Sequence, residues 1–257
     1  MATSAPKIAF HASEKPKAQA ALAEMSALYK SVPAAEADVI VTLGGDGLML
    51  RALHEFTPLG KPIFGLNLGT LGFLLNPYRT ENLLERIAAA KGFDIHPLKM
   101  RATDHNGKTF EEIAFNEVSM LRETHTSAHL RISIDGHERM PKLVCDGLLV
   151  ATPLGSTAYN SSAGGPIVPL EANVLPLTPI SVFRPRRWPG ALIHKDAEIR
   201  IDVLKADERP VSATADSKEI RDVESVTIRE ARNITTRLLF DPEGHLAERI
   251  FAEQFAD

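Results

Sequence analysis

The first hundred residues alternate between two hydrophobic patterns. Short unbroken runs of apolar or β-branched residues, typical of buried strands, occupy residues 7–11, 37–43 and 61–66. Apolar residues recur at the three- and four-residue intervals of a helix over residues 13–30, 48–56 and 80–92. Thr80 is the expected N-cap of the last helix and Gly92 its end. Strands separated by helices imply parallel β-α-β units, so we predict a Rossmann-like α/β domain with a parallel sheet over residues 1–98.

The pattern changes after about residue 93, where strand-like runs follow one another with turn signals between them. Asn106-Gly107 and Asp135-Gly136 are two-residue hairpin signals between alternating segments. Alternation of apolar and polar positions continues over residues 198–204, 210–215 and 225–229. We therefore predict an all-β domain over residues 99–239, which makes the whole chain a two-domain α+β protein.

The end of the chain returns to helical spacing. Leu246, Ile250 and Phe251 lie on one side of a helix predicted over residues 243–255. We expect residues 240–257 to form a tail that packs back on the N-terminal domain.

Composition narrows the class of protein. The 257 residues carry a formal charge of −4, without the basic excess of a domain that grips nucleic acid. The single cysteine, Cys145, cannot form a disulfide within the chain, which favours a reducing compartment. Residues 1–17 lack the apolar core of a signal peptide, and no stretch approaches the roughly 18 apolar residues of a membrane span. We expect a cytoplasmic protein that binds neither nucleic acid nor membranes.

A glycine-rich tetrapeptide follows the second predicted strand. Gly44, Gly45 and Gly47 let a ligand approach the backbone closely, and the next helix offers free N–H groups to phosphate oxygens. In a parallel sheet, ligands bind beyond the carboxyl ends of the strands. Asp46 would repel phosphate unless it binds a metal or takes a proton. A plain tight turn is the alternative, because Asp-Gly is common in turns.

A second candidate site follows the apolar strand that ends near Val150. Residues 152–162 hold five Ser or Thr hydroxyls, one phenol and one carboxamide, a set suited to the hydroxyls, amides and phosphates of a nucleotide. Tyr159 could lie against a base or a ribose. The alternative is a hydroxyl-rich surface loop.

Asn116 and Glu117 form a third candidate within a predicted strand, residues 113–121. The Asn amide can donate to and accept from a base edge, and the Glu carboxylate can accept from two ribose hydroxyls. A solvent-facing pair is the default alternative. His125 and His129 are four residues apart, but their strand or loop context gives no zinc site, and we predict no metal-binding side chains.

Taken together, these three elements resemble the NAD kinase family, whose members phosphorylate the 2′-hydroxyl of the adenosine ribose of NAD to make NADP. The resemblance rests on GGDG at residues 44–47, Asn116-Glu117, and the DG…TP.GSTAY..SAGG pattern over residues 146–165. It implies an N-terminal α/β domain that holds GGDG and a C-terminal β domain that supplies much of the NAD site. It also implies ATP as donor, a divalent cation (Mg²⁺) held mainly by the nucleotide phosphates, and a homodimer or homotetramer.

The resemblance also assigns roles to residues. Asp46 corresponds to the family's proposed catalytic base, and Arg51 to a basic position near the phosphates. The nucleotide-binding positions that we predict are Gly44, Gly45, Asp46, Gly47, Arg51, Asn116, Glu117, Asp146, Leu154, Thr157, Ala158, Tyr159, Asn160, Ser161 and Ser162. The chain departs from the family pattern at Val144, Cys145, Ala151 and Leu154.

Two other functions are compatible with parts of this pattern. A lipid or sugar kinase shares GGDG but leaves the hydroxyl-rich residues 152–162 unexplained. A non-catalytic sensor of NAD or NADH accounts for both motifs without a reaction. Formation of NADP from NAD and ATP distinguishes these possibilities.

Overall fold

The computed structural model describes residues 5–70, 72–242 and 253–255, and its chain forms two compact units. Unit 1 contains residues up to 95 together with the segment from Asn233 to Pro242, and unit 2 contains residues 96–232 and 253–255. The sequence predicts the boundary between the two domains after residue 98, whereas the structure has it after residue 95. The chain returns to unit 1 at Asn233 instead of at residue 240. No helix in the described residues is long and apolar enough to span a membrane.

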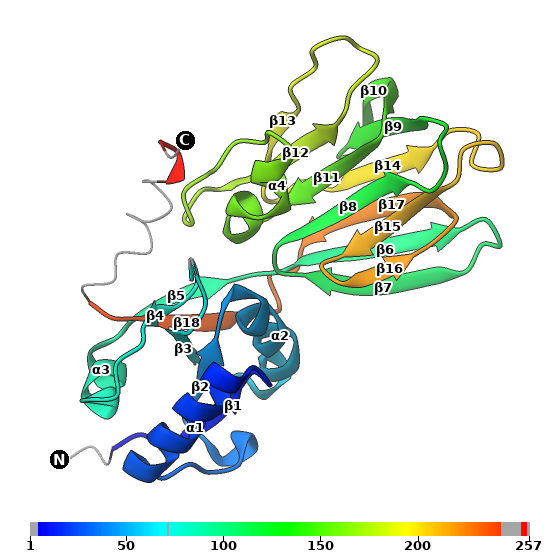
Figure 1. Ribbon diagram of the computed structural model, residues 1–257. Helices are drawn as coiled ribbons and strands as arrows, with labels where there is room; N and C mark the ends of the chain where they lie inside the picture. The colour runs from blue at the N-terminus through cyan, green and yellow to red at the C-terminus, as the bar shows by residue number, and fades with distance from the viewer. Residues whose placement is uncertain (1–4, 71, 243–252, 256–257) are drawn as a thin grey trace. The chain divides into compact units, whose positions relative to one another are not determined.

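Unit 1 is built on a sheet with helices packed on it (Figure 1). The order is β1-β2-β3-β18-β5, with the short β4 also paired to β3. The strands are β1 (Ile8–Ala12), β2 (Val39–Gly44), β3 (Ile63–Asn67), β4 (Asn76–Pro77), β5 (Lys91–Ile95) and β18 (Thr236–Phe240). The helices are α1 (Pro16–Leu28), α2 (Asp46–Phe56) and α3 (Leu83–Ala89), with 3₁₀ turns η1 (Ala34–Glu36) and η2 (Thr57–Leu59). β1, β2, β3 and β18 are parallel, which confirms the predicted parallel β-α-β arrangement, whereas β5 is antiparallel to β18.

The third helix of unit 1 is shorter than the sequence predicts. It starts after Asn82 and ends at Ala89, so the predictions of Thr80 as N-cap and Gly92 as helix end were wrong. The carbonyl of Thr80 instead accepts a hydrogen bond from the hydroxyl of Tyr29 at 2.7 Å. Gly92 lies in β5, where a Cβ would come within 2.8 Å of the Arg237 side chain. Close strand packing, and not a helix stop, therefore accounts for this glycine.

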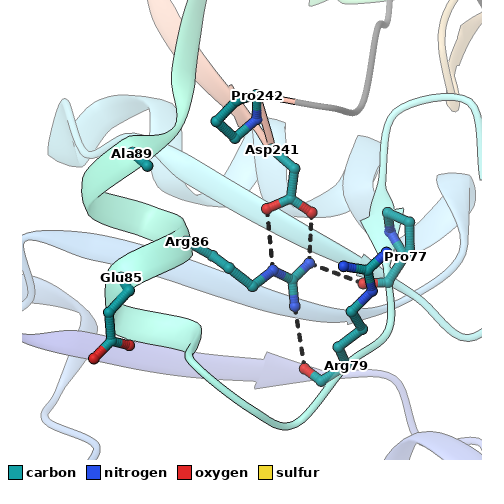
Figure 2. A pocket seen from close by; sticks show the side chains of 7 residues that line it. All are labelled: Pro77, Arg79, Glu85, Arg86, Ala89, Asp241 and Pro242. Atoms are coloured by element: carbon teal, nitrogen blue, oxygen red, sulfur yellow. Dashed lines mark hydrogen bonds and ion pairs between the residues drawn. The ribbon is translucent and has the colours of Figure 1, made fainter.

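A buried ion pair fixes β18 within unit 1 (Figure 2). The Arg86 guanidinium on α3 donates to both carboxylate oxygens of Asp241, at 3.0 and 2.7 Å, and each side chain is only 12% exposed. Arg86 also donates to the carbonyls of Pro77 and Arg79. The end of β18 is thus tied to the helix and to β4. The helix predicted over residues 243–255 lies largely outside the described residues, and so does the expected packing of the tail.

Unit 2 consists of two six-stranded antiparallel sheets, which confirms the predicted all-β class. One sheet has the order β10-β9-β14-β17-β6-β7 and the other β13-β12-β11-β8-β15-β16. The first sheet comprises β6 (Leu98–Asp104), β7 (Thr109–Ala114), β9 (Ala128–Ile134), β10 (His137–Cys145), β14 (Ile199–Val203) and β17 (Val223–Glu230). The second comprises β8 (Glu117–Arg122), β11 (Gly147–Ala151), β12 (Val174–Ile180), β13 (Ala191–His194), β15 (Val211–Ala215) and β16 (Lys218–Ile220).

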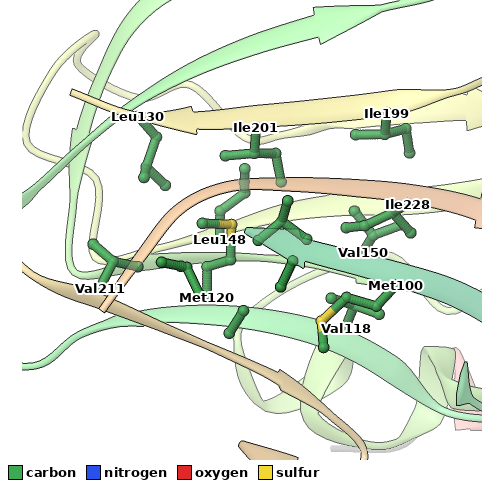
Figure 3. Close-up of a cluster of buried hydrophobic side chains, with 14 of the residues drawn as sticks. Met100, Val118, Met120, Leu130, Leu148, Val150, Ile199, Ile201, Val211 and Ile228 are labelled. Carbon is green, nitrogen blue, oxygen red and sulfur yellow. The ribbon is translucent and has the colours of Figure 1, made fainter. Parts of the chain in front are cut away.

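Alternating residues of both sheets form the core of unit 2 (Figure 3). The period of two places alternate side chains on one face, so Ile199 and Ile201 of one sheet and Leu148 and Val150 of the other are all buried. Both predicted hairpins form, between β6 and β7 and between β9 and β10. Between residues 96 and 232, the helical turns are η3 (Leu154–Thr157) and α4 (Tyr159–Ser162), both within the hydroxyl-rich segment.

Candidate functional site

The glycine-rich turn lies at the carboxyl end of a buried parallel strand, as the sequence predicts. β2 ends at Gly44, Gly45 is the extended N-cap residue, and Asp46 is the first residue of α2. The Gly45 carbonyl accepts hydrogen bonds from the N–H groups of Leu48 and Met49. The first N–H groups of α2 have no partner within the helix, so they are available to an anion.

The glycines of this turn have different neighbours. A Cβ on Gly44 would come within 2.6 Å of the Leu48 side chain, so packing requires glycine there. A Cβ on Gly47 would meet nothing within 4 Å. Gly47 also lies in the helix with ordinary backbone angles, because its φ is not positive. The packing of the protein therefore gives no steric reason for glycine at position 47.

Asp46 is positioned by the loop that follows β3. Its carboxylate accepts hydrogen bonds from the backbone N–H of Phe73 at 3.2 Å and of Leu74 at 2.9 Å. A carboxylate has about four lone-pair positions, so these two bonds leave capacity for a proton or a substrate hydroxyl. Phe73 and Leu74 were missed by the sequence analysis, because a backbone N–H leaves no trace in residue type.

Arg51 lies one helical turn beyond Asp46 and is exposed. It lines a pocket of about 170 Å³ together with Gly44, Gly45 and Gly47. The structure therefore brings the predicted basic residue and the glycine turn to one cavity of unit 1.

In unit 2, Asn116 and Glu117 lie where the chain passes from β7 into β8, and two other segments hold them in place. The Asn116 carbonyl accepts a hydrogen bond from the Thr152 N–H at 2.9 Å, and the Thr152 hydroxyl donates to the Phe115 carbonyl at 2.6 Å. Gly155 packs directly on Asn116, since a Cβ would come within 2.1 Å of the Asn116 carbonyl oxygen. The hydroxyl-rich segment is thus attached to the Asn-Glu pair through backbone contacts.

The Asp216 side chain also holds the backbone at Asn116 and Glu117 in place. Its carboxylate accepts hydrogen bonds from the N–H groups of Phe115 at 2.7 Å, Asn116 at 3.0 Å and Glu117 at 3.3 Å. Asp216 occupies the turn between β15 and β16 with a φ of 51°. The sequence analysis missed it, because an Asp between two alternating runs signals a turn and not a site.

Glu117 is the most strongly perturbed carboxyl group of the candidate site. Burial raises its pKa from the ordinary value to about 7, and the nearby charge of Asp216 acts in the same direction. The backbone N–H of Tyr159 donates to the carboxylate and opposes the rise. In the described part of the chain, Oε2 of Glu117 is buried without a hydrogen-bond partner. A buried, unsatisfied carboxyl oxygen beside Tyr159 is suited to accept a hydrogen bond from a ligand.

The hydroxyl-rich segment separates into supporting and accessible residues. Asn160 is fully buried; its amide donates to the carbonyls of Ser156 and Pro166, and its oxygen accepts from the Thr178 hydroxyl at 2.6 Å. This pairing holds the turn in place, and Leu154 is buried as well. The predicted nucleotide-binding positions of this segment with accessible surface are Thr157, Ala158, Tyr159, Ser161 and Ser162.

Asp146, the remaining predicted position, is half-buried and paired. Arg122, on the neighbouring strand β8, donates from Nε to its carboxylate at 2.6 Å. The pair leaves the Asp146 carboxylate partly open to a ligand. Arg122 was missed by the sequence analysis, because the two residues are brought together only by the pairing of β8 with β11.

The predicted residues thus form two groups, Gly44–Gly47 with Arg51 in unit 1 and the remaining positions in unit 2. Within the described residues, no group of three or more His, Cys, Asp or Glu side chains could hold a metal ion.

The chain is similar to known proteins in both sequence and structure. Residues 3–91 match the model of the ATP-NAD kinase N-terminal domain, and residues 115–233 match that of the ATP-NAD kinase C-terminal domain. An NAD kinase of Xylella fastidiosa is 53% identical over 256 residues, which cover 100% of this chain and 98% of the relative. An NAD kinase of Caulobacter vibrioides is 52% identical, over 97% of this chain and 96% of the relative.

Two solved structures share the fold. An NAD kinase from Archaeoglobus fulgidus in complex with ATP superposes with a TM-score of 0.76 at 23% identity, over 97% of this chain and 98% of that one. A yeast NADH kinase complexed with NADH gives a TM-score of 0.81 at 21% identity, over 97% of this chain and 87% of that one.

Proposed function

The chain belongs to the NAD kinase family, and from this premise we propose that it transfers the γ-phosphoryl group of ATP to the 2′-hydroxyl of the adenosine ribose of NAD. The products are NADP and ADP. A kinase that uses ATP works with a divalent cation. The observation that carries the proposal is the position of Asp46, which begins a helix at the carboxyl end of a parallel strand beside a glycine without packing neighbours.

Asp46 is proposed as the proton acceptor. A ribose hydroxyl is a weak nucleophile at neutral pH, so a carboxylate within hydrogen-bond reach assists by taking its proton during attack on the γ-phosphorus. The oxygen–phosphorus bond to the ribose forms as the bond to the ADP oxygen breaks, and ADP leaves with the electron pair. The N–H groups of Gly47 and its neighbours hold phosphoryl oxygens.

The residues of unit 2 are proposed to bind the dinucleotide. Asn116 offers both donor and acceptor to a base edge, and Glu117 accepts from ribose hydroxyls through its buried, unpaired oxygen. Tyr159 lies against a base or ribose. Thr157, Ala158, Ser161, Ser162 and Asp146 supply the remaining contacts.

Mg²⁺ is the proposed cation. It is held mainly by the donor phosphates, because the described residues contain no cluster of carboxylates that could hold it. When bound to the donor phosphates, Mg²⁺ neutralises negative charge on the group to be transferred. We further propose a cytoplasmic homodimer or homotetramer, which light scattering on the purified protein tests.

The direct experiment is incubation of the purified protein with NAD, ATP and Mg²⁺, followed by assay of NADP with an NADP-specific dehydrogenase. Steady formation of NADP is the expected result. Binding of NAD in calorimetry without any NADP at micromolar enzyme would instead identify a dinucleotide sensor. Phosphorylation of a lipid or sugar in place of NAD would identify a different kinase.

A further inference from the structure

The turn between β15 and β16 is joined to the Asn-Glu pair by both its backbone and a side chain. β15 lies beside β8, and its last residue, Ala215, pairs with Val118 (Figure 1). The next residue, Asp216, donates its backbone N–H to the Glu117 carbonyl at 3.1 Å. Its carboxylate accepts from the three consecutive N–H groups of residues 115–117. Asp216 therefore fixes the position at which the chain enters β8.

The backbone conformation of Asp216 is shared with another aspartate of unit 2. Asp216 and Asp135 each occupy a hairpin turn with a φ of 51°, a left-handed conformation that Asp and Asn adopt more readily than most residues. The Asp135 carboxylate accepts a hydrogen bond from the Glu198 N–H at 2.8 Å. The Asp216 carboxylate differs, because its three donors belong to the segment that carries a candidate ligand-binding pair. The geometry of a hairpin turn alone does not require that arrangement.

Asp216 also places a negative charge beside the Glu117 carboxyl group. In the described part of the chain, Oε2 of Glu117 is buried without a hydrogen-bond partner, while the Tyr159 N–H donates to the carboxyl group. Burial is the main cause that raises the pKa of Glu117 to about 7, and the charge of Asp216 is the second. Like charges in close proximity disfavour ionisation. The Glu117 side chain therefore changes its charge near neutral pH, where an ordinary glutamate is ionised.

We propose that Asp216 is a positioning residue for dinucleotide binding, which fixes the backbone of Asn116 and Glu117 and sets the pH above which Glu117 accepts hydrogen bonds from ligand hydroxyls. An ionised carboxylate accepts through both oxygens, whereas a protonated one uses an oxygen as a donor. NAD should therefore bind more tightly as pH rises through the range in which Glu117 loses its proton. The identity of the ligand rests on the proposed function, whereas the coupling of the two carboxyl groups does not.

The first experiment observes Glu117 in the protein without ligand. Glutamate side-chain carboxyl carbons are labelled with ¹³C, NMR spectra are recorded from pH 5 to pH 9, and the signal missing from Glu117→Gln identifies the residue. We expect the midpoint of its titration to fall by about one pH unit in Asp216→Asn, because the neighbouring negative charge is removed. Asn keeps the shape of the side chain and tolerates the positive φ, and thermal unfolding verifies that the variant is folded.

Two further variants test whether the effect is due to the charge at this position. Asp216→Glu restores a carboxylate and should bring the midpoint back toward that of the wild type. Asp135→Asn is the matched control, since it removes a charge from a hairpin turn with the same φ, and it should leave the midpoint unchanged. An unchanged midpoint in Asp216→Asn, or equally lowered midpoints in Asp216→Asn and Asp216→Glu, would overturn the proposal.

The second experiment measures the Kd for NAD by calorimetry at pH 6 and at pH 8.5. The Kd of Asp216→Asn divided by that of the wild type is expected to be about fivefold lower at pH 6 than at pH 8.5, because protonation of Glu117 opposes binding less in the variant. A purely structural role would raise this ratio equally at both pH values, and such a result would overturn the proposal. In a Glu117→Gln background the ratio should not depend on pH.

The outcomes separate this proposal from the proposed function. A lowered Glu117 midpoint together with the pH-dependent ratio supports the role of Asp216 even if no NADP is formed. Formation of NADP with a ratio that is the same at both pH values overturns the role of Asp216 and leaves the proposed function standing. Failure of the wild type to bind NAD at either pH would overturn both.

Discussion

At the scale of single residues, Asp46 combines a structural contact with a proposed chemical one. Asn in its place keeps the shape and one acceptor oxygen for the Leu74 N–H, but it cannot take a proton. We expect Asp46→Asn to lower kcat by about 10²–10⁴ while NAD affinity changes only a fewfold. Steady-state kinetics and calorimetry measure both quantities.

The matched control for this variant is Asp207→Asn, an exposed aspartate in unit 2, which should leave kcat unchanged. A kcat within about threefold of the wild type in folded Asp46→Asn would refute the proton-acceptor role. A lost rate that excess Mg²⁺ partly restores would indicate a metal-binding role instead. Because the carboxylate also holds the Phe73 N–H, thermal unfolding must be measured beside the kinetics.

Two neighbouring glycines should respond to alanine in opposite ways. Gly47→Ala places a methyl group in open space within a helix, where alanine is more favourable than glycine by up to about 1 kcal/mol. We expect its Tm to be kept or raised while kcat/KM falls at least tenfold. Gly44→Ala brings a Cβ within 2.6 Å of Leu48 and should lower Tm. Thermal unfolding and kinetics on both variants test this, and full activity of Gly47→Ala would show that no ligand uses the open space.

Glu117 makes stability depend on pH. Its pKa is about 7 in the folded protein and near the ordinary value of 4.5 when unfolded, so between these values the folded state holds a proton that the unfolded state has released. The free energy of unfolding that Glu117 contributes is therefore highest below about pH 4.5 and falls as pH rises to about 7. Glu117→Gln removes this dependence.

The measurement is the Tm of both proteins from pH 5 to pH 8. The Tm of Glu117→Gln minus that of the wild type is expected to increase by several degrees over this range, on the order of 5 °C. If the difference in Tm between the two proteins does not change with pH, the pKa of the Glu117 carboxyl group is not raised by burial in solution.

At the scale of elements, the ion pair between Arg86 of α3 and Asp241 at the end of β18 is the contact with the clearest effect on the free energy of unfolding. Arg86→Met leaves the Asp241 carboxylate buried without its partner, which costs about 3–5 kcal/mol. A fall in Tm of about 10 °C is expected. Arg79→Met, which changes a nearby exposed arginine, is the control. Equal Tm values for the two variants would show that the Arg86–Asp241 pair does not stabilise the protein. The double variant Arg86→Met/Asp241→Leu should recover part of the lost Tm, because it leaves no buried charge without a partner.

The strands and helices also explain why some features of the fold and of the candidate site could be predicted from the sequence and others could not. The glycine turn was predictable, because a β-branched strand, a glycine run and a helix follow one another within a dozen or so residues. Gly92 was misread, because a glycine required by the Arg237 side chain on another strand resembles a helix stop. Asp216 and Arg122 act through strand pairing between distant segments, which residue type does not encode. The buried hydrogen bonds of Asn160 depend on the tertiary fold, which a hydroxyl- and amide-rich sequence leaves undetermined.

At the scale of the whole molecule, the two units differ in what they need in order to fold. Residues 96–232 of unit 2 form one continuous segment with its own core. Unit 1 depends on β18, which lies between β3 and β5 in the sheet. We expect a fragment of residues 96–232 to unfold cooperatively on its own, whereas residues 1–95 alone should not, since β5 then has no neighbour. Circular dichroism during thermal unfolding of both fragments checks this, and a cooperative transition in residues 1–95 would contradict it.

The position of β18 also determines the order in which the protein is completed during its synthesis. Arg237 of β18 pairs with Asp94 of β5 across 143 residues of chain. A ribosome adds roughly 5–20 residues per second, so the first-made strands wait for their partner while the whole of unit 2 is produced. The edges of β3 and β5 are unpaired during that interval and can pair with other chains. Unit 1 is therefore finished only after residues 96–232 of unit 2 have been made, and the nascent chain is most exposed to aggregation before β18 emerges.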